Sequence, residues 1–415
     1  MEQVDIAVIG AGPAGSSAAA WAARGGASVA LFEKAAQGRD KSCGDGLTPR
    51  AIEECRRLGL DVERFHRIDG LRVQAGSKVR EVLWPDGAFP PVGAVAPRAE
   101  FDAMVMQAAI DSGADFRENA PAEPWIEDNR VLGVISKGEK VRAQLTVIAS
   151  GAGSPAARAV GATRIASSPF GLAIRGYIPS TRADDRYMEA CLTVNGPDGS
   201  IVPGYGWVFP AGNGIVNIGV GALSTMKNFS DLNLNTMLDA YTAQVRESWG
   251  LGEFVARPKA WRLPMHVEHR GGPGWVVAGD AAGLVNPFNG EGIDYALESG
   301  RHAAECFLTE PGTAWAAYQA VLRKEYDPFF ATARRFAWLI GRPKLLQFLL
   351  GIALSTNFTM KLVLDIMANL VDMEHPGLAG RSLTIGGKAL SLADPLLVRS
   401  SAKSKAKAKA TTPVG

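Results

Sequence analysis

The sequence contains few cysteines, and none is placed for a structural role. Among 415 residues there are 4 cysteines, and Cys43, Cys55, Cys191 and Cys306 form no Cys-x-x-Cys pair. This spacing predicts neither a disulfide framework nor a zinc site, so we expect no metal centre. Free cysteines in such a chain indicate a reducing compartment.

An excess of either charge is also missing from the folded part of the chain. The formal net charge is +2, and no acid follows Asp394, whereas five basic residues do. This charge lies mainly in a low-complexity basic tail, residues 401–415, which we expect to be disordered. A nucleic-acid-binding protein carries its charge on folded elements, so we expect no nucleic acid partner. The lysines of this tail could either keep the protein soluble or contact an anionic membrane surface.

The sequence has no hydrophobic run that could cross a bilayer. Residues 345–360 are uncharged, but the stretch is too short and includes Gln347, Ser355, Thr356 and Asn357. It suits a helix in the core or a helix lying on a membrane surface. No basic segment precedes the first apolar run, so we expect no signal peptide and a cytoplasmic location.

The N-terminal stretch carries the strongest positive signal. Residues 4–9 are mostly apolar, and an alanine-rich helix is predicted after the turn Gly10-Ala11-Gly12-Pro13-Ala14-Gly15. A strand, a Gly-x-Gly-x-x-Gly turn and a helix in this order are typical of a dinucleotide site. The helix N-terminus offers unpaired N–H groups to a pyrophosphate. A glycine-rich turn without any ligand is the alternative.

An acid at the end of the second predicted strand supports the dinucleotide site. Glu33 follows residues 28–32 and lies 23 positions after Gly10, near the spacing of the carboxylate that accepts ribose hydroxyls. We expect Glu33 and Lys34 to bind the adenosine end. A 2′-phosphate is not expected there, because Glu33 would repel it.

The rest of the chain predicts a divided α/β protein. Strand–helix alternation in residues 1–70, 98–165 and 264–310 predicts three parts of one nucleotide-binding unit. Short β-like runs predict a hairpin in 71–97 and an antiparallel substrate sheet in 166–263. Residues 311–400 are predicted to be helical and are a candidate for membrane contact.

Four further stretches contain candidate site residues, each with a structural alternative. The loop with Cys43, Gly44, Asp45, Gly46 and Leu47 suits a flat ligand or a plain loop. Arg98 could pair with Asp102 or reach a phosphate. Tyr205 and Trp207 share one face of a predicted strand, as a core stripe or as a cavity wall. Asp280 ends another strand, where it could bind a ligand or cap the following helix, which is predicted to begin near Gly290.

Together these stretches resemble the geranylgeranyl reductase family of FAD proteins. The resemblance covers nearly the whole chain except the tail, and it is carried most specifically by residues 41–47, 205–210 and 279–293. Within the family the chain is most similar to the menaquinone reductases of actinobacteria, in residues 44–50, 203–207 and 217–225. These enzymes saturate one isoprene unit of the quinone tail.

The resemblance implies a fold and a cofactor. The fold would be a Rossmann-like FAD-binding domain of the para-hydroxybenzoate hydroxylase type, with an inserted antiparallel-sheet substrate domain and a C-terminal helical region. The bound cofactor would be FAD. The implied cofactor-binding residues are Gly10, Ala11, Gly12, Pro13, Ala14, Gly15, Glu33, Lys34, Gly44, Asp45, Gly46, Leu47, Arg98, Asp280, Gly290, Gly292 and Ile293.

The resemblance also implies a reaction: hydride from reduced flavin and a proton from an unidentified acid would saturate the isoprenyl double bond of menaquinone. Aromatic faces of Tyr205 and Trp207 would ease cationic character at the tertiary carbon, and Cys43 would tune the step. The electron donor is not identified, and Ser150-Gly151 replaces the Asp-Gly pair at which related hydroxylases engage NADPH. A polyprenyl substrate favours a peripheral position on the cytoplasmic side of the membrane.

Three alternative functions remain open at this stage. The chain could reduce geranylgeranyl lipids or pigments instead of menaquinone. It could be a flavin-dependent monooxygenase or halogenase, because Tyr205-x-Trp207-x-Phe209-Pro210 partly matches the halogenase strand Trp-x-Trp-x-Ile-Pro. It could also be a lipid-binding flavoprotein that escorts polyprenyl quinone without turnover.

Overall fold

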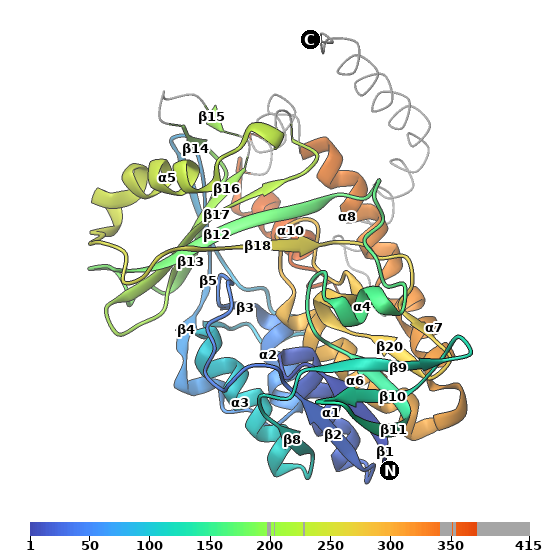
Figure 1. The fold of residues 1–415 in the computed structure, drawn as a ribbon. Coiled ribbons are helices and arrows are strands. Elements are labelled where there is room, and N and C mark those ends of the chain that lie inside the picture. Colours follow the sequence, from blue (N-terminus) through green and yellow to red (C-terminus); the bar gives the residue numbers. More distant parts are fainter. Residues whose placement is uncertain (197–200, 203, 227–228, 341–350, 352–353, 372–415) are drawn as a thin grey trace, which may run out of the picture.

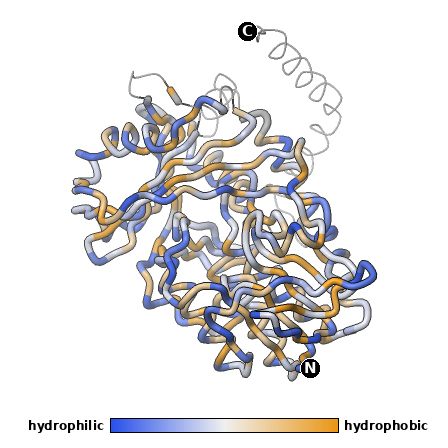
Figure 2. The backbone as a smooth tube through the Cα atoms, viewed as in Figure 1, coloured by the Kyte–Doolittle hydropathy of each residue, from blue (hydrophilic) through white to orange (hydrophobic). Residues whose placement is uncertain are grey.

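The structure is a computed structural model that describes residues 1–196, 201–202, 204–226, 229–340, 351 and 354–371. The predicted tail 401–415, and the part of the predicted helical region from residue 372 onward, lie outside the described residues. The fold has two parts: a lower part in which helices pack against a sheet, and an upper part built on a second sheet (Figure 1). Hydrophobic segments run through the strands of both parts, whereas hydrophilic segments lie mainly along the outside (Figure 2).

The lower part is built on a largely parallel sheet. Its main strand order is β19-β20-β11-β1-β2-β8; in addition, β10 pairs with β11, and β9 pairs with β10. The strands are β1 (Glu2–Ile9), β2 (Val29–Phe32), β8 (Asp115–Arg117), β9 (Ala122–Glu127), β10 (Arg130–Ser136), β11 (Glu139–Ile148), β19 (Gly271–Gly272) and β20 (Trp275–Val277).

The carboxyl ends of the central parallel strands lie level with one another. Ile9 pairs with both Phe32 and Ile148, and Ile148 pairs with Val277. The Gly10–Gly15 turn, Glu33 and the segment that contains Asp280 therefore begin at the same edge of the sheet. Ligands of open parallel sheets bind at this edge.

Small residues bring two helices of the lower part into close contact. Helix α1 (Pro13–Arg24) packs against α6 (Ile293–Thr309) and α3 (Arg98–Asp111). A Cβ atom on Gly300 would lie 2.3 Å from the backbone oxygen of Ala14, so α6 can approach α1 this closely only with glycine there. Two further helices belong to this part, α2 (Pro49–Arg57) and α4 (Pro155–Ala159).

The upper part is a sheet of seven strands in the order β18-β12-β17-β16-β13-β5-β6. These are β5 (Gly70–Ala75), β6 (Lys78–Leu83), β12 (Phe170–Pro179), β13 (Tyr187–Cys191), β16 (Tyr205–Pro210), β17 (Ile215–Leu223) and β18 (Lys259–Pro264). Helix α5 (Leu234–Trp249) covers one face through Met237, Leu238 and Tyr241 (Figure 1). The other face is left for the cavity described below.

Two details of the upper part differ from the sequence prediction. The strands of residues 166–263 pair antiparallel with one another, as predicted. However, β13 also pairs in parallel with β5 of the hairpin, because the chain reaches β13 through other strands instead of a tight turn. In addition, residues 71–97 do not all join this sheet. Their last strand, β7 (Gly93–Val95), pairs with β3 (Gly46–Leu47) and β4 (His66–Ile68) in a separate small sheet. A two-stranded sheet, β14 (Val194–Asn195) with β15 (Ile201–Val202), completes the strands.

The C-terminal part of the described chain is helical. It comprises α7 (Ala314–Glu325), α8 (Asp327–Ile340) and α10 (Asn357–Met367). The uncharged stretch 345–360 is not one continuous helix, because Thr356 caps α10 with its side chain and the residues just before it are not helical. Leu354 and Met360 are buried, whereas Phe358 is 65% exposed. No helix in the described ranges is long and apolar enough to span a membrane.

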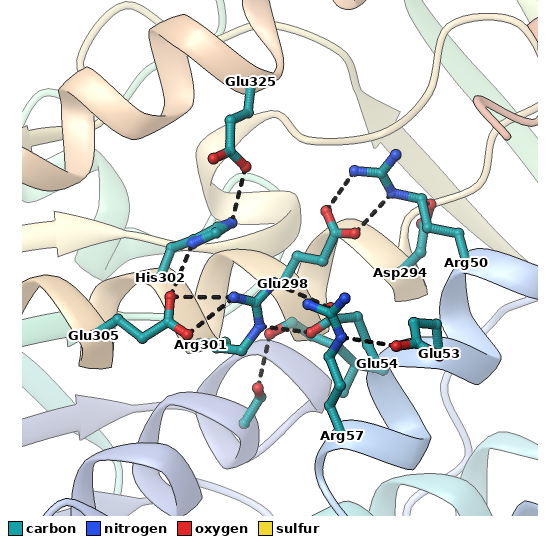
Figure 3. A network of polar contacts seen from close by, with 12 residues as sticks. Arg50, Glu53, Glu54, Arg57, Asp294, Glu298, Arg301, His302, Glu305 and Glu325 are labelled. Atoms are coloured by element: carbon teal, nitrogen blue, oxygen red, sulfur yellow. Dashed lines mark hydrogen bonds and ion pairs between the residues drawn. The ribbon is translucent and has the colours of Figure 1, made fainter. Parts of the chain in front are cut away.

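Helix α6 is held in place by ion pairs whose strength depends on pH (Figure 3). His302 lies 3.2 Å from carboxylate oxygens of both Glu305 and Glu325. Burial alone would lower the pKa of His302, but hydrogen bonds to Glu305 and Glu325 raise it to about 9. Because the folded-state pKa lies above the unfolded value, this interaction stabilises the protein fully below about pH 6.5 and is lost as pH rises through 9.

We therefore expect the variant His302→Gln to be destabilised most in mild acid. The free energy of unfolding should fall by roughly 1–2 kcal/mol near pH 6, a figure reduced because both partner carboxylates are partly exposed. The difference from the wild type should shrink above pH 9, which denaturant titrations at several pH values would measure. A destabilisation that does not change with pH would show that His302 acts through packing alone.

Candidate functional site

The carboxyl edge of the lower sheet faces the open side of the upper sheet across a large cavity. This cavity has a volume of about 540 Å³ and is lined by both parts of the protein. A second, small cavity of about 30 Å³ lies beside Ala11 and Glu33. The two cavities flank the N-terminus of α1.

The glycines of the first turn have different physical roles. Gly10 has a φ of 101°, and a Cβ atom there would lie 2.7 Å from the backbone oxygen of Ala149. A Cβ on Gly15 would lie 1.8 Å from the backbone oxygen of Gly10. In contrast, a Cβ on Gly12 would meet no protein atom within 4 Å. Gly10 and Gly15 are thus required by packing, whereas Gly12 leaves space in front of the helix N-terminus, which suits a pyrophosphate.

Glu33 connects the end of β2 to this turn. Its carboxylate accepts hydrogen bonds from the backbone N–H of Ala11, at 2.9 Å, and of Ala35, at 3.1 Å. It lines the small cavity together with Arg39, whose Nε lies 3.8 Å from Glu33 Oε1. Lys34 is exposed and lines neither cavity.

The loop after residue 40 forms one wall of the large cavity. Cys43, Gly44, Asp45 and Gly46 line it, whereas Leu47 is fully buried in the core of the lower part. The backbone N–H of Asp45 donates to Cys43 Sγ at 3.3 Å. Burial raises the pKa of the Cys43 thiol, so this side chain is protonated near neutral pH.

Asn217 fixes this loop to the upper sheet. Its side-chain N–H groups donate to the backbone oxygen of Cys43 and to Asp45 Oδ2, both at 2.8 Å. Its side-chain oxygen accepts the indole N–H of Trp207 at 3.0 Å. Tyr177 donates a further hydrogen bond to Asp45 Oδ2 at 2.5 Å. Burial raises the pKa of Asp45 to about 6, although the bonds from Tyr177 and Asn217 oppose this shift.

The aromatic side chains of β16 line the cavity, as one of the two alternatives from the sequence predicts. Tyr205, Trp207 and Phe209 alternate along the strand and face the cavity, while Gly206 between them faces α5. The rings of Tyr205 and Trp207 are 5.7 Å apart, and Tyr205 donates a hydrogen bond to the backbone oxygen of Asn289 at 2.8 Å. The strand thus presents a continuous aromatic surface to the cavity.

The segment that leads into α6 forms another part of the cavity wall. Gly290, Gly292 and Ile293 line the cavity, and Gly292 is the N-cap residue of α6. The helix therefore directs its free N–H groups toward the cavity. Asp280 also lines the cavity and pairs with Lys41 at 3.1 Å.

Arg98 pairs with Asp102, which is one of the two alternatives that the sequence leaves open. It is 3% exposed and forms two 2.7 Å hydrogen bonds with Asp102, yet it also lines the large cavity. Asp102 lines the small cavity. The pair therefore lies between the two cavities and holds the guanidinium in a fixed position.

The remainder of the cavity is apolar. Its wall includes several methionines and the inner side of α10, namely Met188, Met226, Met265, Met360, Leu364 and Met367. Methionine side chains adapt to irregular apolar shapes. This region suits a flexible hydrocarbon better than a rigid polar ligand.

Several residues at the cavity were missed by the sequence analysis. Arg175 and Asn217 stand alone as polar residues in otherwise apolar strands, a pattern that indicates a buried polar contact. Arg175 donates to the backbone oxygens of Cys43 and Lys41 and pairs with Asp40. Glu291, which lines the cavity between two glycines, was also overlooked.

The edge predicted to bind a dinucleotide thus opens onto a cavity with a largely apolar wall, which suits an apolar substrate. A family model described as "FAD binding domain" matches residues 3–307. The protein is an FAD-dependent oxidoreductase.

Comparison with known proteins narrows this class. The menaquinone reductase of Mycolicibacterium smegmatis is 40% identical over 400 residues, which covers 93% of this chain and 97% of that protein. The digeranylgeranylglycerophospholipid reductase of Thermoplasma volcanium is 31% identical over 322 residues, covering 74% and 78%. The chain belongs to the family of menaquinone and geranylgeranyl reductases. A geranylgeranyl bacteriochlorophyll reductase-like structure from Thermoplasma acidophilum shares the fold, with a TM-score of 0.77, 23% identity and coverage of 94% of this chain and 100% of that one.

Proposed function

We propose that this protein saturates a double bond in the isoprenyl tail of menaquinone. The observation that carries the proposal is a single cavity in which the predicted flavin-binding segments, an aromatic strand and an apolar channel wall meet. The 40% identity with a menaquinone reductase over nearly the whole chain supports the quinone as substrate.

The residues at the cavity edge suit FAD in an extended form. The pyrophosphate would lie at the N-terminus of α1, in the space beside Gly12, with the adenosine end toward Glu33. The flavin ring would lie between the loop at 44–46 and the N-terminus of α6, where helix N–H groups favour negative charge. Asp280 would bind the ribityl chain, and Arg98 would reach it or the phosphates. When bound, reduced FAD supplies the hydride.

The aromatic strand would bind the reacting double bond. An isolated trisubstituted alkene accepts hydride only as positive charge develops at its tertiary carbon, and aromatic faces stabilise such charge. Trp207 and Tyr205 present these faces, and the hydrogen bond from Trp207 to Asn217 fixes the orientation of the indole. Cys43 would contribute as a neutral thiol beside them.

We also propose that the tail enters beside α10 from a membrane surface. Met360, Leu364 and Met367 of α10 line the cavity, while Phe358 on the same helix is 65% exposed. An exposed aromatic side chain next to a cavity wall suits insertion into the lipid interface. The proposed membrane is the cytoplasmic one, approached from its inner side.

The variant Phe358→Asp is expected to lose affinity for vesicles of anionic and zwitterionic lipids. Sedimentation with such vesicles should show binding of the wild type and at least about tenfold weaker binding of the variant. The reason is that a charge replaces an exposed ring that would insert into the lipid. Val255→Asp, at another exposed apolar side chain outside the cavity wall, is the control and should bind like the wild type. Equal binding of all three proteins would contradict entry beside α10.

The substrate is tested by offering the reduced holoprotein two polyprenyl compounds. Menaquinone should gain two hydrogens in its tail, whereas a digeranylgeranyl glycerolipid should remain unchanged or react far more slowly. Preferential saturation of the lipid would assign the protein to the lipid reductases instead. Binding of menaquinone without saturation would indicate a carrier.

A further inference from the structure

One group of buried charges near the cavity has no role in the function described so far. Three carboxyl groups, those of Glu291, Asp294 and Glu298, lie at the start of α6 or just before it, and the cation that faces them in the described chain is Arg50 of α2. Figure 3 shows Arg50 with Asp294 and Glu298. Arg50 Nη2 donates to Glu298 Oε2 at 2.8 Å, and Arg50 Nε lies 4.0 Å from Asp294 Oδ2. Three ionised carboxylates around one guanidinium would leave an uncompensated buried charge.

Asp294 is the carboxyl that cannot stay ionised in this group. Its side chain is 0% exposed, and neither of its oxygens has a hydrogen-bond partner among the described residues. Burial and the neighbouring charge of Glu291 raise the pKa of Asp294 well above its ordinary value, more than Arg50 lowers it. Asp294 therefore holds a proton at neutral pH.

Glu291 differs from Asp294 because it reaches the cavity. It is only partly buried and lines the cavity wall between Gly290 and Gly292. Its carboxylate accepts hydrogen bonds from Thr48 and, at 3.2 Å, from Asn289. Burial raises the pKa of Glu291 to about 7, against these two hydrogen bonds and the charge of Arg50. Its protonation thus changes in the physiological range.

Apart from Arg50, the other described groups that face these carboxyls are neutral. Thr48 and Arg50 come from the start of α2, and Tyr295 lies on α6. Tyr326, from the end of α7, donates to Glu298 Oε2 at 2.8 Å, and the backbone oxygen of Asn369 accepts from Arg50. Farther along α6, Arg301 and His302 are paired with other acids (Figure 3).

Other charged groups of the cavity wall are engaged elsewhere. Lys41 pairs with Asp280, Arg98 with Asp102, and Arg175 with Asp40. Asp45 also lines the cavity, but it is 0% exposed, and its carboxylate accepts hydrogen bonds from Tyr177 and Asn217. Among the described acids of the wall, Glu291 is the one that is partly exposed and has no ion-pair partner within 4.0 Å.

We propose that Glu291 is the proton donor for saturation of the double bond. This inference rests on the proposed function. In the step, the O–H bond of the Glu291 carboxyl breaks, and its proton forms a C–H bond with the less substituted alkene carbon, using the electron pair of the C=C π bond. The hydride forms the second C–H bond at the tertiary carbon, and Glu291 is left as a carboxylate. Glu291, which is only partly buried, is then reprotonated from solvent.

The variant Glu291→Gln tests this assignment, because glutamine keeps the size and the hydrogen-bonding groups but has no acidic proton. The single-turnover rate of tail saturation should fall at least about 100-fold. In the wild type this rate should decrease as pH rises through about 7, and the variant should lose that dependence. Glu305→Gln, at a partly exposed acid of α6 outside the cavity, is the control and should keep the wild-type pH profile.

A second measurement separates this inference from the proposed function. Infrared spectra of the holoprotein without substrate should show a protonated carboxyl that disappears as pH rises through about 7, and Glu291→Gln should remove this signal. If the signal is present but menaquinone is not saturated by the wild type, the proposed function fails and the titrating carboxyl stands. A wild-type rate and pH profile in Glu291→Gln, or an infrared signal that persists in it, would overturn the role of Glu291.

Discussion

Replacing Gly15 with alanine is expected to lower the free energy of unfolding by about 3 kcal/mol or more and to yield protein without FAD. The added Cβ would lie 1.8 Å from the backbone oxygen of Gly10, so α1 must move away from the end of β1. That movement displaces the helix N-terminus from the edge of the sheet. Circular dichroism during denaturant titration and the flavin absorbance of the purified variant would measure both effects.

Gly12→Ala is the matched control, because it adds the same methyl group where no protein atom lies within 4 Å. Gly12 has a φ of −76°, which alanine adopts without strain. The apoprotein should therefore keep its stability to within about 1 kcal/mol. Its affinity for FAD should nevertheless fall at least about tenfold, because the methyl group occupies the space in front of the helix N–H groups. Unchanged FAD affinity in Gly12→Ala would show that the pyrophosphate does not lie there.

The second large effect is expected for Asn217→Leu. Asn217 is 0% exposed and connects the backbone oxygen of Cys43, the carboxylate of Asp45 and the indole of Trp207 through three hydrogen bonds. Leucine has a similar volume but leaves three buried polar groups without this partner, at a cost of about 1–3 kcal/mol each. The free energy of unfolding should fall by about 3–5 kcal/mol. The turnover of the folded fraction should fall about 100-fold, because the loop and the indole lose their common support.

Trp207→Phe separates the contributions within this group. Phenylalanine keeps an aromatic face toward the cavity but cannot donate to Asn217, so we expect a loss of about 1 kcal/mol in stability. Turnover should fall much less than in Asn217→Leu, as single-turnover rates would show. If Asn217→Leu folds and turns over like the wild type, the connection through Asn217 has no functional role.

Much of the nucleotide-binding edge could be predicted because its signals are local. The Gly10–Gly15 turn, Glu33 and the strand before Asp280 each combine a strand, a turn and a following element within a short window. The structure brings their starting points to one edge through the register of Ile9, Phe32, Ile148 and Val277. A parallel sheet makes such convergence a general expectation.

The polar groups beneath the cavity could not be predicted, because their partners are distant in sequence. Asn217 lies 172 positions from Asp45, and Arg50 lies 248 positions from Glu298. A local pattern shows only that a polar residue stands in an apolar strand, as for Asn217, or beside glycines, as for Glu291. Which groups face one another is decided by how the upper sheet and α6 meet α2, and this depends on packing across the whole fold.

The topology of the inserted sheet was predicted only in part for a similar reason. Turn signals predict antiparallel neighbours, but no turn connects β5 with β13, whose parallel pairing joins segments more than 100 positions apart. The interruption before α10 likewise arises from side-chain capping by Thr356, which an uncharged stretch does not reveal by hydropathy alone. In both cases a specific contact between residues determines the structure, and a local sequence pattern does not reveal that contact.

One anaerobic turnover of reduced holoprotein with menaquinone tests most directly whether this protein reduces the isoprenyl tail. The product should be reoxidised in air before mass spectrometry, because reduction of the quinone head also adds two hydrogens and air removes them. We predict a gain of two hydrogens that survives reoxidation, lies in a tail fragment and matches the amount of flavin oxidised. Flavin oxidation without any lasting gain of mass in the tail would contradict the assignment of this protein as a reductase of the isoprenyl tail.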